Sequence, residues 1–292
     1  MRKRFFSVVS DIIRQNNNSF FILIDIGAYA CRDLIKEYPE RVKNIGIFED
    51  GIVGIASGLA CAGFTPIIYG ISPFLINRAN EQLKLDFAYQ NFGGNFISTG
   101  ASYDFSSLGF SHYCPEDISY LRNIPGFEIC TPSTPSQLEK LLTTCWNNGA
   151  PTYYRMTDYC SEFDCEIEFG KANLVKTGHD LTIVAFAETI DKVIEASQGY
   201  DISIIYYSTI IPFDSEIIAQ YASSKILIVS PFYVGFITDL IVKAKKDEYI
   251  MVKEIGVPHE ILRNYGSKEE KDCYCGITVE GIKAEIEELL LK

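Results

Sequence analysis

The sequence predicts an α/β protein of two domains, each a mostly parallel sheet flanked by helices. Three observations support this fold class. The chain has 292 residues, more than one ordinary hydrophobic core usually serves. Hydrophobic residues make up 47% and charged residues 22%, as in a packed globular protein. Short apolar runs alternate with amphipathic stretches along the chain, a pattern typical of parallel strands joined by covering helices.

The first domain is expected over residues 1–160. A basic opening that soon reaches Asp11 predicts a first helix and not a signal peptide. A later helix is expected from Thr134, an N-cap candidate that is followed by Pro135 and by Gln137 in the capping-box position. Six apolar runs of strand length are found at residues 20–26, 44–48, 66–71, 95–99, 127–130 and 151–155.

A second α/β domain is expected over residues 178–292. A mixed polar stretch at 161–177 interrupts the apolar rhythm and predicts a linker. The final helix is expected to begin near Val279. The strands of this domain are expected at residues 181–186, 202–207, 225–229 and 249–254.

Charge, hydropathy and cysteine usage exclude several classes of partner. The net charge of −12 repels phosphate backbones and anionic lipid, so no nucleic-acid partner is expected. No apolar run approaches the length of a membrane span, so no membrane association is expected either. The nine cysteines include no C-x-x-C pair, which argues against a metal site and favours reduced thiols in the cytoplasm.

Residues 44–60 predict a strand, an acidic turn and a glycine-rich helix. Asp50 is a natural N-cap, and three glycines, at positions 51, 54 and 58, share one helix face. Each glycine costs roughly 1 kcal/mol relative to alanine, so another group must approach this face closely. Tight helix packing alone explains the glycines. Glu49 ends the predicted strand, at the edge where open α/β sheets bind ligands, although a solvated glutamate fits the same position.

The segment NIGIFEDGIVGIASGLA at residues 44–60 resembles the hallmark segment of the pyrimidine-binding domain of the transketolase family. The similarity covers nearly the whole chain. It implies the two-domain fold of the C-terminal half of a transketolase that is split into two chains. Further matching segments lie at residues 37–41, 78–83, 111–112, 116–118, 122–125 and 151–155, and then at 170–172, 178–183, 211–214 and 265–270.

The resemblance implies thiamine diphosphate as cofactor and Glu49 as a catalytic, cofactor-binding residue. In the family, the matching glutamate hydrogen-bonds the aminopyrimidine ring and favours the imino tautomer, whose nitrogen removes the proton from the thiazolium carbon. This chemistry requires a carboxyl group that can share a proton near neutral pH. Burial at a subunit interface, and the neighbouring acid Asp50, would each raise the pKa of a carboxyl toward that range.

Four other positions receive roles from the resemblance. Phe74 matches the aromatic residue that stacks on the pyrimidine ring, and a core phenylalanine is the competing interpretation. Asp25 matches a cofactor-side aspartate after a one-residue adjustment. His112 matches a histidine that faces the substrate and takes part in catalysis. Arg155 matches an arginine that binds the phosphate of a sugar, and an interdomain salt bridge explains it equally well.

A missing motif implies a partner. The chain contains no Gly-Asp-Gly followed by a downstream asparagine, the signature that binds the cofactor's diphosphate through Mg²⁺. The resemblance therefore implies a separate N-terminal transketolase-like subunit that carries the diphosphate-binding domain and most of the Mg²⁺ ligands. The expected assembly is a heterotetramer of two copies of each chain.

Two departures from the family pattern bear on the substrate. Leu108 lies where transketolases carry an acidic residue before the histidine, and residues 230–232 replace an acidic position in the second domain. Both favour a specialised sugar or sugar-phosphate donor or acceptor, such as one used in unusual-sugar biosynthesis. Two alternatives to a ketol-transferring subunit stay open: the β subunit of a 2-oxo acid dehydrogenase, and an inactive regulatory or scaffolding subunit.

Overall fold

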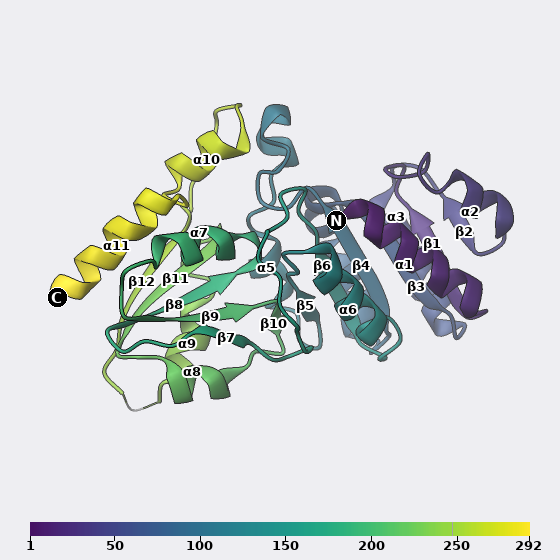
Figure 1. Cartoon of the computed structure of the whole chain (residues 1–292). Helices are drawn as coiled ribbons and strands as arrows, with labels where there is room; N and C mark the ends of the chain where they lie inside the picture. The colour runs from purple at the N-terminus through teal and green to yellow at the C-terminus, as the bar shows by residue number, and fades with distance from the viewer. Residues whose placement is uncertain (247) are drawn as a thin grey trace.

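The computed structural model describes residues 1–246 and 248–292, and these residues form two sheets with helices on their faces (Figure 1). A seven-stranded sheet has the order β10-β5-β6-β4-β3-β1-β2, and a five-stranded sheet has the order β12-β11-β8-β9-β7. The strands are β1 (Ser19–Leu23), β2 (Val42–Asn44), β3 (Thr65–Ile71), β4 (Gly94–Thr99), β5 (Glu128–Cys130), β6 (Pro151–Arg155), β7 (Asn173–Lys176), β8 (Leu181–Phe186), β9 (Ile202–Tyr207), β10 (Thr209–Ile211), β11 (Lys225–Tyr233) and β12 (Met251–Val257).

Helices connect nearly all the parallel strands. The α-helices are α1 (Arg2–Gln15), α2 (Arg32–Glu37), α3 (Glu49–Cys61), α4 (Asn80–Gln82), α5 (Asp117–Leu121), α6 (Pro135–Cys145), α7 (Ile190–Ala196), α8 (Ser215–Tyr221), α9 (Thr238–Ala244), α10 (Lys268–Tyr274) and α11 (Val279–Leu291). The π-helical turns are η1 (Phe74–Arg78) and η2 (Leu83–Ala88), and the 3₁₀ turns are η3 (Ser106–Leu108), η4 (Phe110–His112) and η5 (Ala187–Thr189).

Each sheet is covered on both faces. Side chains of α1 and α6 pack on one face of the seven-stranded sheet, and those of α3 and η1 pack on the other. Helices α7 and α11 cover one face of the five-stranded sheet, while α8 and α9 cover its second face. One apolar cluster runs without a break from Ile22 and Ile68 of the first sheet to Ile228 and Phe232 of the second. The predicted fold class, two mostly parallel sheets flanked by helices, is confirmed.

Most predicted strands agree with the structure, but the strand expected at 44–48 is wrong. The strand β2 covers Val42–Asn44 and is an edge strand, because the chain turns immediately after it. The side-chain oxygen of Asn44 accepts hydrogen bonds from the backbone N–H groups of Asp25 (3.0 Å) and Gly46 (3.2 Å). Gly46 itself has a φ of +88°, which favours glycine and ends the extended conformation.

Two short antiparallel strands were not predicted. β7 lies inside the expected linker and pairs with β9 at the edge of the second sheet. β10 follows β9 in sequence but pairs with β5, so it belongs to the first sheet. Each has only three or four residues, too few for a periodic signal. The domain limits 1–160 and 178–292 stay a prediction, because β7 begins before residue 178 and β10 of the second half joins the first sheet.

The predicted start of α6 is confirmed in part. The hydroxyl oxygen of Thr134 accepts a hydrogen bond from the backbone N–H of Gln137 (3.2 Å), and Pro135 is the first helical residue. The Gln137 side chain accepts instead from the backbone N–H of Ser133 (3.0 Å), one residue before the expected partner. No helix within the described residues has both the length and the apolar character needed to span a bilayer.

Candidate active site

Glu49 is the first residue of α3. Phe48 lies at the N-cap position and its side chain makes no capping hydrogen bond, so the prediction that Asp50 caps the helix is wrong. Glu49 and Asp50 both lie in the first turn, where negative charge is stabilised by the exposed N–H groups and dipole of the helix. The turn at Asn44 and Gly46 thus leads directly into the helix start that positions the Glu49 carboxylate.

The Glu49 carboxylate is buried and held from one side. Its side chain is 3% exposed, and Nη1 of Arg78 donates a hydrogen bond of 2.6 Å to Oε2. Arg78 is 48% exposed, so its guanidinium contacts solvent while it neutralises the buried charge. Among the described residues, Oε1 of Glu49 has no hydrogen-bonding partner. The second oxygen is therefore free to bind a ligand atom.

Two aromatic side chains extend the site away from Glu49. The guanidinium carbon of Arg78 lies 4.7 Å from the centre of the Phe74 ring, in a cation–π contact. The Phe74 ring is half-buried and lies edge to face with the His112 imidazole, with 5.1 Å between ring centres. We call Glu49, Arg78, Phe74 and His112 the Glu49 cluster. The structure thus brings three of the five predicted site residues together.

Sequence reasoning assigned no role to Arg78, although it opens one of the matching segments. A signal was present. Arg78 and Phe74 are four positions apart, a spacing that places side chains on one face of a helical turn. The π-helical turn η1 carries both, and it starts immediately after β3 and Pro73. The link from Arg78 to Glu49 could not be predicted, because these residues are joined only by the tertiary fold.

Asp25 lies outside the Glu49 cluster. It is exposed, has a φ of +60°, and is held by Asn44, whose side-chain N–H donates to its carboxylate at 3.3 Å. Asn44 also binds Gly46, three residues before Glu49. The hydrogen bond of the Asp25 side chain thus links it to the turn that precedes α3. Among the described residues, the Asp25 side chain has no hydrogen bond to Phe74 or His112.

The glycine face of α3 is open within this chain. A Cβ atom on Gly51 would lie 1.9 Å from the Phe48 ring, so that ring explains one glycine. A Cβ atom on Gly54 would meet only Asp86 at 3.7 Å, and one on Gly58 would meet nothing within 4 Å. Tight packing inside the chain therefore does not explain Gly54 and Gly58.

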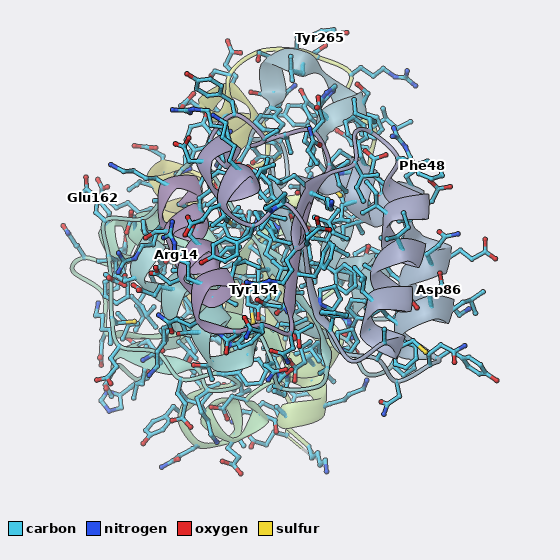
Figure 2. All side chains as sticks on the ribbon, turned by 90° about the vertical axis from the view of Figure 1, so that its right-hand side faces the viewer. Arg14, Phe48, Asp86, Tyr154, Glu162 and Tyr265 are labelled. Carbon is cyan, nitrogen blue, oxygen red and sulfur yellow. The ribbon has the colours of Figure 1, made fainter. Side chains whose placement is uncertain are left out.

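Apolar side chains beside this face are also exposed. Ile47 is 70% and Phe48 is 56% exposed, and Ile55 on α3 is exposed as well. Figure 2 shows Phe48 and Asp86 on the outer side of the molecule, along the same flank. Exposed apolar side chains next to a buried carboxylate are typical of a surface that another polypeptide covers.

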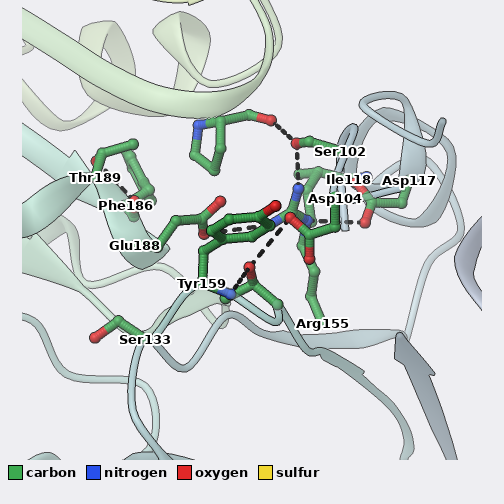
Figure 3. A network of polar contacts seen from close by, with 12 residues as sticks. Ser102, Asp104, Asp117, Ile118, Ser133, Arg155, Tyr159, Phe186, Glu188 and Thr189 are labelled. Carbon is green, nitrogen blue, oxygen red and sulfur yellow. Dashed lines mark hydrogen bonds and ion pairs between the residues drawn. The ribbon is translucent and has the colours of Figure 1, made fainter. Parts of the chain in front are cut away.

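Arg155 is fully buried between the two sheets (Figure 3). Its side chain is 1% exposed, and Nε donates a hydrogen bond of 2.9 Å to the Asp117 carboxylate, which is inaccessible to solvent. Nη1 lies 3.7 Å from Oε2 of Glu188, in the second half of the chain. The guanidinium carbon lies 4.7 Å from the centre of the Phe232 ring, in a cation–π contact. The contact with Glu188 crosses between the two halves, as the alternative of an interdomain salt bridge requires, whereas Asp117 lies in the same half as Arg155.

Asp104 adds a further carboxyl group to this buried network. Oδ2 accepts a hydrogen bond from the backbone N–H of Asp158 (3.0 Å), and Oδ1 accepts one from the Thr157 hydroxyl (3.2 Å). Burial, followed by repulsion from Glu188, raises the pKa of Asp104 to about 7, against an ordinary value of 3.8. Below about pH 7 the folded chain therefore favours the protonated form of this acid.

Asp104→Asn is expected to stabilise the protein above neutral pH. Because the folded-state pKa is raised, the contribution of Asp104 to stability is fully present below pH 3.8 and is lost as pH rises through about 7. Asparagine imitates the protonated acid at every pH. We expect the melting temperature of the variant to exceed that of wild type by a margin that widens as pH rises from 5 to about 7, and that reaches about 3 °C or more at pH 8.5.

Melting curves of both proteins from pH 5 to 8.5 would measure this difference. Asp180→Asn, at an exposed turn, is the matched control and should leave the pH profile unchanged. Parallel profiles for wild type and Asp104→Asn would contradict the assignment of Asp104 as a buried, protonated acid.

Comparisons with known proteins agree with this geometry. Residues 16–158 match the family model described as "Transketolase, pyrimidine binding domain". The chain is 29% identical to one of the subunits of the apulose-4-phosphate transketolase of Phocaeicola vulgatus, with 93% of this chain and 95% of that protein covered. It is 27% identical to an "Uncharacterized 33.6 kDa protein in fasciation locus" of Rhodococcoides fascians, over 98% of this chain and 93% of that protein.

A solved structure described as "Split gene transketolase, inactive beta4 tetramer" has a TM-score of 0.88 and 21% sequence identity. The alignment covers 99% of this chain and 98% of that chain, which shows a shared fold from end to end. Residues 16–158 belong to the family of transketolase pyrimidine-binding domains. In length and fold the chain corresponds to the C-terminal chain of a split transketolase.

Proposed function

We propose that this chain is the C-terminal subunit of a two-chain transketolase that transfers a two-carbon ketol unit between sugars and depends on thiamine diphosphate. One observation carries the proposal. The buried Glu49 carboxylate has Oε2 fixed by Arg78 and Oε1 without a partner among the described residues, and it belongs to one cluster with Phe74 and His112. A carboxylate and an aromatic ring are the two groups that the pyrimidine end of the cofactor requires, so the residues present fit it.

Each residue of the Glu49 cluster has a distinct role in this proposal. Bound thiamine diphosphate supplies the carbon–carbon bond chemistry. Glu49 holds the shared proton at Oε1, and Arg78 keeps the carboxylate oriented by binding Oε2. Phe74 offers its ring to the pyrimidine by stacking. His112, whose Nδ1 lies 3.0 Å from the Ser111 hydroxyl, faces the sugar and donates or accepts a proton there.

The proposal includes a second polypeptide that supplies the diphosphate-binding domain and the Mg²⁺ ligands. The exposed Ile47, Phe48 and Ile55 beside the site support a covering polypeptide, since this apolar surface would otherwise face water. Two copies of each chain would form a heterotetramer. Nine free thiols are consistent with a place in the reducing cytoplasm.

The relative from Phocaeicola vulgatus, which is named as part of a transketolase, favours this function over that of a 2-oxo acid dehydrogenase β subunit. An inactive scaffold has no use for a buried carboxylate with one unpaired oxygen. We also propose a specialised donor or acceptor, since Leu108, which is exposed four residues before His112, replaces the acidic residue of the family pattern. Full transketolase rates with ordinary ketose phosphates would contradict this last point.

Cofactor binding by the assembled pair tests the proposed function. The chain and a candidate partner that carries Gly-Asp-Gly with a downstream asparagine are purified apart and titrated calorimetrically with thiamine diphosphate and Mg²⁺. We expect no measurable binding by this chain alone, and both binding and ketol transfer by the mixture. Equally tight binding by the isolated chain would contradict partner dependence. A mixture that binds the cofactor but transfers no ketol unit would contradict the transferase role.

A further inference from the structure

The loop between β4 and α5 carries His112, and contacts from the second half of the chain hold it. Ser102 and Cys114 form an antiparallel bridge that closes the base of the loop. Between them, Tyr103 and Tyr113 point inward and are buried, although they belong to a loop that contains exposed residues. The conformation of the loop is therefore set by the partners of these two tyrosines.

Those partners come from the C-terminal region. Tyr103 and Tyr113 share one small apolar cluster with Tyr233, Val257 and Leu262, which is separate from the main cores. The cluster joins the His112 loop to β11, to β12 and to the segment that follows β12. No residue of the first sheet contributes to it within the described part of the chain.

Asp272 of α10 is the polar centre of this contact. Its Oδ1 accepts a hydrogen bond of 2.6 Å from the Tyr103 hydroxyl, and both oxygens accept from Lys268 at 3.0 Å. Lys192 donates to Oδ2 at 2.5 Å, so three donors converge on one carboxylate that is almost inaccessible to solvent. Such a charged, fully satisfied network fixes side-chain positions firmly.

Two more contacts reach closer to His112. The Tyr113 hydroxyl donates to the backbone oxygen of Ser106 in its own loop (2.9 Å) and to that of Asn264 beyond β12 (3.2 Å). The Tyr265 ring lies against Gly109, where a Cβ atom would approach it to 2.6 Å. Gly109 has a φ of +83° and immediately precedes the turn η4 that ends at His112. Figure 2 shows Tyr265 at the outer end of the molecule.

We propose that Asp272 and Tyr103 are positioning residues that fix His112, so that the C-terminal region sets the geometry at the substrate end of the site. The inference rests on the proposed function, because it assigns a catalytic purpose to the contact. Glu49 and Phe74 are carried by other segments and do not depend on this network. Loss of the network should therefore lower kcat/KM for the sugar substrate and leave the affinity for the cofactor unchanged.

Tyr103→Phe in the assembled complex tests the proposal, since it removes one hydroxyl and keeps the ring in its apolar cluster. We expect kcat/KM for the sugar substrate to fall about tenfold or more, since a small displacement of a reacting group is costly, while affinity for thiamine diphosphate stays unchanged. Tyr200→Phe is the matched control, because it removes an exposed tyrosine hydroxyl that binds Glu287 at 2.9 Å. It should have no effect on kcat/KM.

A double-mutant cycle separates positioning from general destabilisation. In a His112→Ala background, Tyr103→Phe should cause no further loss of kcat/KM, because its effect acts through His112. A loss of equal size in both backgrounds would overturn the proposal, as would wild-type kcat/KM for Tyr103→Phe. If Tyr103→Phe does not fold, Tyr265→Ala carries the same expectations, because it removes an exposed ring from Gly109.

Hydrogen exchange on the chain alone keeps this test independent of the proposed function. Tyr103→Phe should accelerate amide exchange in residues 104–113 and leave α3 unchanged. Wild-type exchange in the loop would overturn the proposal, even if the wild-type complex is active. An inactive wild-type complex with accelerated loop exchange in the variant would instead count against the proposed function and support the structural contact.

Discussion

Glu49→Gln is expected to lower the turnover of the assembled complex by about 1,000-fold at saturating cofactor, because glutamine cannot take up or release the shared proton. The fold should tolerate the change. Glutamine has nearly the same shape and keeps an oxygen for Arg78, and the guanidinium of Arg78 is half exposed, so it is not left buried without a counter-charge. Steady-state ketol transfer by the variant and by wild type, each with the same partner chain, measures the effect.

Glu37→Gln is a suitable control for the loss of one arginine–glutamate pair. Glu37 accepts a hydrogen bond of 3.0 Å from Arg14, and both side chains are about half exposed. This variant should retain wild-type turnover. A Glu49→Gln complex that also turns over normally would remove the basis for a catalytic carboxylate and would favour a scaffolding role.

Arg155→Met is expected to destabilise the chain by about 3–5 kcal/mol, because it leaves the Asp117 carboxylate buried without a positive partner. The melting temperature should fall by roughly 6–15 °C, or the protein should fail to fold. Thermal unfolding of the purified chain followed by circular dichroism measures this loss, and no partner or cofactor is needed.

Two further variants show whether the loss of stability comes from the buried ion pair of Arg155. Arg155→Lys keeps the charge but cannot reproduce the guanidinium contacts to Asp117 and Ser102, so an intermediate loss is expected. Lys171→Met removes an exposed pair with Glu216 and should leave stability nearly unchanged. If Arg155→Met folds with wild-type stability but raises KM for a phosphorylated sugar, the result would contradict the structural role and favour the predicted substrate-binding role of Arg155.

Long apolar runs made much of the fold predictable. The strands β6, β8 and β9 coincide with the expected ranges, and β8 and β9 are nearly continuous apolar segments, as buried parallel strands usually are. The run at 44–48 also holds three apolar side chains but lies mostly outside the sheet. Ile47 and Phe48 are exposed in this chain, so a rule that places apolar residues in the core of their own chain fails here.

The candidate site was predictable because the segment at residues 44–60 resembles a known family, whose site residues could then be matched to this sequence. Resemblance pointed to Glu49, Phe74 and His112, and the fold places them in one cluster. Arg155 shows the limit, because its partner Asp117 lies 38 positions away and contact between them arises only when β6 and α5 pack together. Pairings of this kind depend on tertiary structure and leave no periodic pattern in the sequence.

The position of β10 has a consequence for how the chain can be divided. A polypeptide that stopped at residue 160 would keep six strands of the first sheet but would lose the strand that covers β5. The freed edge would present unpaired backbone groups, which recruit strands from other molecules and promote aggregation. The second half therefore contributes a strand to the sheet of the first half, and a fragment that ends at residue 160 should be less soluble than the whole chain.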